Sequence, residues 1–321
     1  MERLAAITRR QHSESSSTGA EEGRAPAEAS LETIIIGLSG PSSSGKTTLA
    51  RLLREIFNLR IGGLKVSLAI LHQDDSYKTD KDIPVLSVTS NEFGTRELQD
   101  WDCVDSLDLP LFEHTLRYLH DHGSLPPDSV SKEDENSVGE SHVSSEDVEE
   151  WKTKVKSWLD DRGQAGKQES KLEEKQIRIY IVDGFLLYPP APSSSQANTY
   201  PHTQEGLNHL HGLIQKFLQP KLFIPSTRQQ TLTRRAARSG YVTLEGFWTD
   251  PPGYVEDVVW PNYILYHSWM YKDGNVDGEE FDDKVCESQG LKVCPGGGQW
   301  KMPEVLEWAV QQVKESIEAR V

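Results

Sequence analysis

The chain has 321 residues, 36% of them hydrophobic, and a formal net charge of −16, with a mean hydropathy of −0.57. This acidic excess argues against a nucleic-acid partner, because binding to phosphate backbones depends on a basic surface. The three cysteines lack metal-ligand spacing and indicate reduced thiols, so we expect a cytoplasmic or nuclear protein. No apolar run approaches the ~18 residues of a membrane helix, so no membrane partner is predicted. Composition leaves the oligomeric state open.

Residues 1–31 are rich in Ser, Glu, Ala and Gly and contain almost no large apolar side chain. Such a segment cannot bury enough surface to fold, so the sequence predicts a disordered tail. Arg9 and Arg10 beside serines are typical of a mitochondrial presequence, but the acids from Glu14 onward argue against one. Residues 32–321 are expected to form a single domain.

The first motif is a glycine-rich loop between a predicted strand and a predicted helix. Gly40 to Thr47 reads Gly-Pro-Ser-Ser-Ser-Gly-Lys-Thr and fits the phosphate-binding pattern G-x-x-x-x-G-K-[ST]. The apolar run Thr33 to Leu38 precedes it, and leucines at helical spacing follow from about Lys46. In such a loop, N–H groups and the lysine bind phosphates while the threonine hydroxyl ligates Mg²⁺. The predicted nucleotide-binding residues are Gly40, Ser42, Ser43, Ser44, Gly45, Lys46, Thr47 and Thr48.

Two further apolar runs end in acids. Val66 to Leu71 leads to Asp74 and Asp75, and Ile177 to Val182 leads to Asp183. Carboxyl ends of strands are where open α/β sheets bind ligands. In a kinase, Asp74 would accept the proton of an attacking hydroxyl close to Mg²⁺, and Asp183 would hold Mg²⁺ or its waters. The alternatives are a helix cap for the first acids and a simple Asp-Gly turn for Asp183.

Trp101 and Asp102 open the next helical pattern. A large aromatic ring beside an acid suits a nucleoside, because the ring stacks on a base and the carboxylate accepts from two ribose hydroxyls. Taken alone, such a pair is more often a core aromatic beside a helix cap. Both interpretations stay open at this point.

Residues 126–176 are dominated by Ser, Glu, Asp and Lys, with sparse apolar residues. The composition predicts an inserted, largely disordered acidic loop with at most one loose helix, dispensable for chemistry. A partner-binding segment is the other interpretation.

An arginine-rich stretch at about residues 228–250 is predicted to form a small lid. Arg234 and Arg238 are four residues apart and project from one helix face, with Arg235 offset by one position. Arginines on a lid can neutralise charge that develops on a transferring phosphate, although a solvated basic helix face is the more common meaning of such a run.

Together with short apolar runs at 221–224 and 290–293, the strands predict an α/β fold. We expect the P-loop NTPase type, with a parallel five-stranded sheet, helices on both faces and a small lid.

The ordered motifs resemble one family, the nicotinamide riboside kinases, within the uridine-kinase-like group of P-loop kinases. The resemblance covers nearly the whole chain outside the tail and the acidic insert. It is carried by residues 37–48, Gln73-Asp74-Asp75-Ser76-Tyr77-Lys78, Trp101-Asp102, residues 182–187, Arg234-Arg235 with Arg238, and Pro252-Gly253-Tyr254 with Trp260-Pro261.

The resemblance implies phosphorylation by ATP of the 5′-hydroxyl of nicotinamide riboside, or of its acid form, in NAD salvage. It implies Asp74 as the catalytic base and a metal-shell residue, Thr47 and Asp183 at Mg²⁺, and Lys46, Arg234 and Arg238 at the ATP phosphates. The riboside site would contain Asp74, Asp75, Tyr77, Trp101, Asp102 and Arg235. Tyr241 is the lid aromatic predicted to enclose the base with Trp101.

Two residues depart from the family pattern, which commonly has Tyr at Trp101 and Glu at Asp183. The nearest rival function is a uridine or cytidine kinase, and a rival of another class is a non-catalytic nucleotide-binding scaffold. A pyrimidine site should offer hydrogen-bonding groups at the edge of the base, whereas this sequence offers aromatic rings.

Overall fold

The computed structural model describes residues 30–131, 136, 139–165, 175–192, 201–238, 240–243 and 246–320. Residues 1–29 of the predicted tail lie outside this description. The last two tail residues, Ser30 and Leu31, instead begin the first strand, β1 (Ser30–Ser39).

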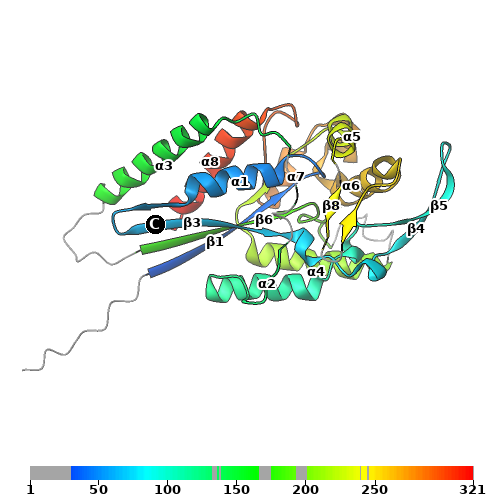
Figure 1. Cartoon of the computed structure of the whole chain (residues 1–321), viewed down its shortest axis with the longest axis horizontal. Coiled ribbons are helices and arrows are strands. Elements are labelled where there is room, and N and C mark those ends of the chain that lie inside the picture. Colours follow the sequence, from blue (N-terminus) through cyan, green and yellow to red (C-terminus); the bar gives the residue numbers. More distant parts are fainter. Residues whose placement is uncertain are drawn as a thin grey trace, which may run out of the picture.

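The centre of the molecule is a six-stranded sheet with the order β10-β7-β1-β6-β3-β2 (Figure 1). Five strands run parallel and coincide with the five predicted ones: β1, β3 (Leu64–His72), β6 (Lys175–Gly184), β7 (Lys221–Phe223) and β10 (Leu291–Val293). The α/β class is therefore confirmed, but the strand count was wrong by one. The sixth strand, β2 (Leu59–Ile61), pairs antiparallel with β3 through a two-residue Gly62-Gly63 turn.

Helices cover both faces of the sheet, because alternate residues of each strand are apolar on opposite sides. Ile34 and Ile36 of β1 pack in one core with α1 (Lys46–Phe57), α3 (Ser145–Ala165) and α8 (Met302–Glu318). Ile35 packs in the other core with α2 (Leu109–His122), α4 (Pro201–Phe217), α6 (Trp260–His267) and α7 (Asp283–Ser288). Figure 1 shows α1, α3 and α8 on one side and α2 and α4 on the other. In the described part of the chain, no helix is both long and apolar enough to cross a bilayer.

The acidic insert contains more structure than its composition indicates. Its helix α3 has 21 residues and packs against α1, with Val148, Val155 and Leu159 at most 5% exposed within the core. Trp158 donates from Nε1 to Glu318 at 3.2 Å, and Arg162 pairs with the same carboxylate at 2.6 Å. The expectation of one loose helix was wrong, because a few well-spaced apolar residues suffice to anchor a helix whose other faces are charged.

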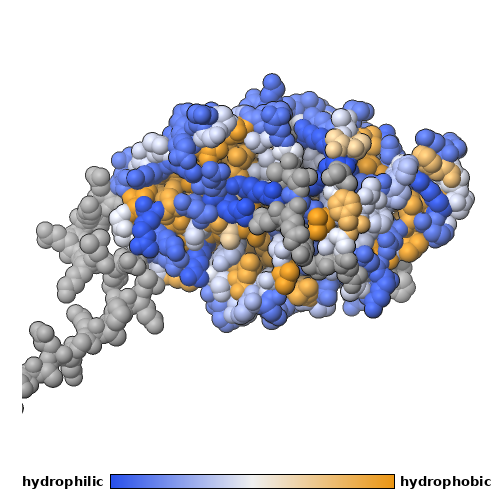
Figure 2. Space-filling model, viewed as in Figure 1, coloured by the Kyte–Doolittle hydropathy of each residue, from blue (hydrophilic) through white to orange (hydrophobic). Residues whose placement is uncertain are grey.

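Smaller elements gather at the carboxyl end of the sheet. A hairpin of β4 (Val85–Ser90) and β5 (Gly94–Gln99) projects from the body, and the arginine-rich stretch forms α5 (Arg228–Ala236), β8 (Tyr241–Val242) and β9 (Phe247–Trp248) (Figure 1). A π-helical turn at Val255–Val259 precedes α6. Short 3₁₀ turns lie at Gln73–Ser76, Asp80–Asp82, Val104–Ser106, Ser268–Met270, Lys272–Gly274 and Val276–Gly278. The face shown in Figure 2 is hydrophilic over much of its area with hydrophobic patches between, and the hairpin exposes Val85, Leu86 and Phe93.

Candidate active site

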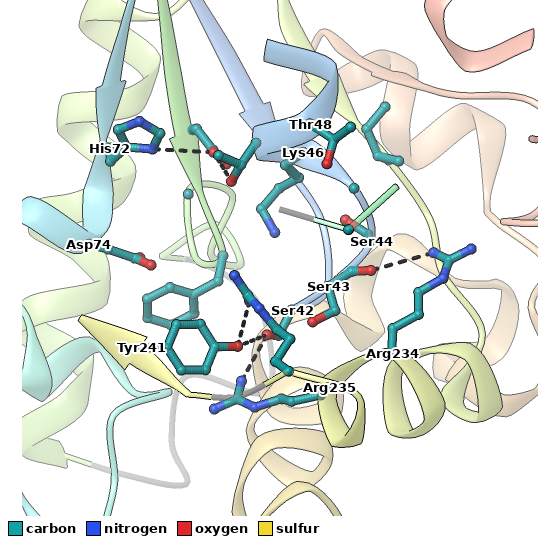
Figure 3. A pocket seen from close by; sticks show the side chains of 18 of the residues that line it. Ser42, Ser43, Ser44, Lys46, Thr48, His72, Asp74, Arg234, Arg235 and Tyr241 are labelled. Atoms are coloured by element: carbon teal, nitrogen blue, oxygen red, sulfur yellow. Dashed lines mark hydrogen bonds and ion pairs between the residues drawn. The ribbon is translucent and has the colours of Figure 1, made fainter. Parts of the chain in front are cut away.

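A cavity of about 990 Å³ lies at the carboxyl ends of β1, β3 and β6, under α5 and β8 (Figure 3). It brings together the predicted site residues from segments far apart in the sequence. Those that line it are Ser42, Ser43, Ser44, Gly45, Lys46, Thr47, Thr48, Asp74, Asp75, Tyr77, Trp101, Asp102, Asp183, Arg234, Arg235, Arg238 and Tyr241. Gly40 is the one predicted site residue that is not part of the cavity wall.

The phosphate loop, Gly40–Thr47, depends on its two glycines. A Cβ on Gly40 would lie 2.2 Å from the carbonyl oxygen of Ile224, and Gly45 adopts φ 99° immediately before α1. Lys46 donates from Nζ to the carbonyls of Gly40 and Pro41, both at 3.0 Å. Burial lowers the pKa of Lys46, although the carboxylates of Asp183 and Asp74 oppose this shift. The loop thus presents N–H groups and a buried lysine at one end of the cavity.

Asp183 lies at the end of β6, directly opposite the start of α1. Its Oδ2 accepts a hydrogen bond of 2.6 Å from the Thr47 hydroxyl and lies 3.4 Å from Nδ1 of His72. Burial would raise the pKa of Asp183, but the hydrogen bond from His72 and the charge of Lys46 lower it, so the carboxylate stays ionised. Hydroxyl and carboxylate oxygens are the ligand types that Mg²⁺ prefers, so Thr47 and Asp183 fit such an ion.

Within the described residues, no group of three or more His, Cys, Asp or Glu side chains could hold a metal by itself. A nucleotide-bound Mg²⁺ does not need such a cage, because phosphate oxygens and waters complete its coordination around one or two protein ligands.

Asp74 and Asp75 belong to the 3₁₀ turn that follows β3. Gln73 fixes this turn against the end of β6: its Nε2 donates to the Leu186 carbonyl at 2.7 Å, and its Oε1 accepts from the Leu186 N–H at 3.0 Å. The Asp74 carboxylate faces the cavity and contributes to the field at Lys46 (Figure 3). The two strand ends therefore converge, as their positions in a parallel sheet predict.

The aromatic end of the cavity is built around Trp101, which is only 6% exposed. Tyr77 meets its ring edge-on with centroids 5.2 Å apart, and Trp248 of β9 lies at 5.6 Å. Tyr241 is directed to the phosphate loop instead, where its hydroxyl lies 3.4 Å from Ser42 Oγ (Figure 3). The lid aromatic beside Trp101 is thus Trp248, and the prediction of Tyr241 for this position is not supported.

Arg235 links the two ends of the cavity and is 7% exposed. Its guanidinium donates to Asp250 at 2.6 and 3.1 Å, to Asp102 at 3.3 and 3.4 Å, and to Ser42 Oγ at 2.8 Å. Burial would lower the pKa of Arg235, but the two carboxylates raise it well above its usual value. Burial raises the pKa of Asp102, against the charge of Arg235. One cation and two anions therefore share this buried cluster.

The other two arginines of the lid lie over the phosphate loop. Arg234 donates to the Ser43 carbonyl at 3.4 Å (Figure 3). Arg238 donates to the Tyr241 hydroxyl at 2.6 Å, with its guanidinium carbon 4.1 Å from the centre of the Tyr241 ring. These contacts leave two cations at the phosphate end of the cavity.

Sequence reasoning missed three residues of the site: His72, Trp248 and Asp250. Asp250 accepts from Trp248 Nε1 at 3.0 Å in addition to Arg235, so it positions both side chains. A signal for this pair was present, since an aromatic residue near an acid recurs at 248–250 as it does at Trp101-Asp102. Nothing in the sequence distinguishes His72 from a residue of the strand interior.

No family model matches the chain. The curated relatives include the nicotinamide riboside kinase of Schizosaccharomyces pombe, which is 30% identical over 89% of this chain and 99% of the relative. That of Saccharomyces cerevisiae is 27% identical over 88% and 97%, and human nicotinamide riboside kinase 2 is 23% identical over 79% and 80%. The solved structure of the YGR205w protein is similar over 64% of this chain and 68% of its own, with 16% identity and a TM-score of 0.35, too low to carry weight.

Proposed function

The chain belongs to the nicotinamide riboside kinase family and is a phosphotransferase, and we propose that it transfers the γ-phosphoryl group of ATP to the 5′-hydroxyl of nicotinamide riboside. The product is the mononucleotide of NAD salvage, and nicotinic acid riboside is a second candidate substrate. The observation that supports this reaction best is the shared cavity, which joins a phosphate loop to an aromatic pocket with the Asp74 carboxylate on the same wall.

Asp74 is the proposed general base. The 5′-hydroxyl gives its proton to the Asp74 carboxylate while its oxygen forms a bond to the γ-phosphorus, and the bond to the ADP oxygen breaks. Positioning of the two reactants contributes most of the rate in such a reaction, because the protein makes no covalent bond to the phosphoryl group.

The phosphate end supplies charge. Lys46, Arg234 and Arg238 are proposed to neutralise the phosphate oxygens, where negative charge builds up as the leaving oxygen departs. Thr47, Asp74 and Asp183 are the residues that would hold Mg²⁺, Asp183 through water. When bound, this ion neutralises and orients the β- and γ-phosphates.

The aromatic end is proposed to bind the riboside. Asp102, with Arg235, would accept hydrogen bonds from the ribose diol, and Asp75 and Tyr77 would border the sugar. The base would pack against the paired rings of Trp101 and Trp248, whose centroids are 5.6 Å apart. A cationic nicotinamide ring over aromatic faces gains about 1–2 kcal/mol when water is excluded, which a neutral pyrimidine does not.

The test is turnover on a panel of nicotinamide riboside, nicotinic acid riboside, uridine and cytidine, with ATP or GTP and with or without Mg²⁺. We expect the highest kcat/KM for nicotinamide riboside with ATP and Mg²⁺. Strong preference for uridine would favour a pyrimidine nucleoside kinase, and ATP binding without turnover on any nucleoside would favour a scaffold. Lys46→Met provides the inactive control.

A further inference from the structure

Asn136 of the acidic insert reaches the lid. It is 6% exposed, and both polar atoms of its side chain bond to the backbone of Val242 in β8. Oδ1 accepts from the Val242 N–H at 2.7 Å, and Nδ2 donates to the Val242 carbonyl at 3.4 Å. A side-chain amide that bonds both the N–H and the C=O of one residue makes the same two hydrogen bonds that a neighbouring β-strand would make. Asn136 therefore holds the backbone of β8 at Val242.

The main chain at Asn136 is in turn held by α1. Arg51, which lies about one and a half helical turns from the start of α1, donates from its guanidinium to the Asn136 carbonyl at 3.3 Å. Because α1 begins directly at the phosphate loop, Asn136 connects the lid strand to the same rigid helix that carries Lys46 and Thr47.

The strand held by Asn136 carries groups that act on the phosphate end. Tyr241, next to Val242, has its hydroxyl beside Ser42 and Arg238, and its ring under the guanidinium of Arg238. Residues 139–142 of the insert also line the cavity. A shift of β8 would therefore move Tyr241 and, through it, the position of Arg238.

We infer that Asn136 is a positioning residue that fastens the lid strand β8 over the phosphate loop. The acidic insert is then part of the working enzyme and not the dispensable segment that its composition predicts. The effect on nucleotide retention stands without the proposed function, whereas the effect on phosphoryl transfer to a riboside rests on it.

The test compares Asn136→Ala and Asn136→Asp with the wild type. The alanine variant loses both bonds to Val242, so we expect a ribose-labelled fluorescent ATP analogue to dissociate about 5–10-fold faster, since a buried hydrogen bond contributes about 1 kcal/mol. In turnover, kcat should fall by a similar factor while KM for the riboside stays within about twofold. The aspartate variant keeps the acceptor of the shorter bond but places a carboxylate oxygen opposite the Val242 carbonyl, so the analogue should dissociate faster than from the wild type as well.

A matched control is Asn58→Ala. Asn58 makes the same pair of bonds, with the N–H and carbonyl of Leu68 at 2.9 and 3.2 Å, but it is exposed, lies at the far end of α1 and also donates to the Arg54 carbonyl at 2.8 Å. Its loss should lower the thermal midpoint and leave the dissociation rate and kcat unchanged. If Asn136→Ala behaved like Asn58→Ala, Asn136 would be structural only and the inference would be overturned.

A double-mutant cycle tests the route through β8. In a Tyr241→Phe background, Asn136→Ala should have a smaller effect than in the wild type, because both changes release Arg238. Full additivity would overturn the inference. If alanine at 136 prevents folding, the aspartate variant carries the same comparison. A wild type that binds the analogue but phosphorylates no riboside would refute the proposed function alone.

Discussion

The two ends of the cavity are built in different ways. The phosphate end comes from one contiguous stretch, in which Gly40, Gly45 and Lys46 take their positions from local backbone geometry at the start of α1. The aromatic end comes from segments as far apart as Tyr77, Trp101-Asp102 and Trp248–Asp250, and Arg235 joins the last two. Turns hold the phosphate end, whereas paired charges hold the aromatic end. Substitutions at the two ends should therefore differ in how much they change stability and how much they change the rate.

Asp74, on the wall between the two ends, should give the largest loss of rate. Asp74→Asn removes the proposed base, so we expect kcat to fall by about 10²–10⁴-fold, while ATP affinity and the thermal midpoint stay close to wild type. Steady-state kinetics and titration calorimetry measure these quantities. The control is Asp82→Asn, an exposed carboxylate outside the cavity wall. Unchanged turnover in Asp74→Asn would remove Asp74 from the mechanism.

Substitutions of Arg234 and Arg235, which are adjacent in α5, distinguish the two ends of the cavity most directly. Arg235→Met leaves the buried Asp102 and the half-buried Asp250 without their cation, so the free energy of unfolding should fall by about 3–5 kcal/mol. Arg234 is exposed to a greater extent and donates a long hydrogen bond of 3.4 Å to the loop carbonyl of Ser43. Arg234→Met should therefore change stability by less than about 0.5 kcal/mol and lower kcat at least about 10-fold. Urea unfolding measures the loss of stability of both variants, and steady-state kinetics measure their loss of rate. Equal losses of stability would mean that the ends do not differ.

Asp100 lies beside the aromatic end, is 3% exposed, and accepts from the Asp102 N–H at 3.0 Å and from Asn262 at 2.8 Å. Burial raises its pKa from 3.8 to about 6. The native state therefore keeps this proton longer than the unfolded chain, and stability falls as pH rises from about 4 to 6. The cost above pH 6 approaches about 3 kcal/mol at 1.36 kcal/mol per pH unit.

Asp100→Asn removes this titration while keeping an oxygen acceptor. The difference in unfolding free energy, variant minus wild type, should therefore increase by up to about 3 kcal/mol between pH 4 and pH 7. Urea unfolding at several pH values measures it. A constant difference across this range would contradict the raised pKa.

The smallest expected effect distinguishes the roles of the two lid aromatics, Trp248 and Tyr241. Trp248→Leu removes a ring beside Trp101 and should raise KM for nicotinamide riboside about 10-fold, the equivalent of ~1.4 kcal/mol. Tyr241→Leu should leave this KM within about twofold and lower kcat, because its hydroxyl holds Arg238. The opposite pattern would restore Tyr241 as the stacking residue.

The sequence was sufficient to predict the parallel strands, the phosphate loop and the acids at the strand ends, because each of them depends on a local pattern or on the direction of the strands. The sequence offered Tyr241 as the aromatic beside Trp101 and did not consider Trp248, because which residue of the loop packs on Trp101 depends on tertiary contacts such as the bond between Trp248 and Asp250. The helix α3 was underestimated because average composition hides three apolar residues at helical spacing. The edge strand β2 depends on a two-glycine turn that was not considered.

The helix α3 has a practical consequence for anyone who wishes to shorten this protein. Its buried residues Val148, Val155 and Leu159 share a core with α1 and α8. Excising residues 126–176 to obtain a minimal enzyme would uncover that apolar surface on the helix that follows the phosphate loop, and the trimmed chain should self-associate. A safer trimming would retain residues 136–165, which include both Asn136 and α3.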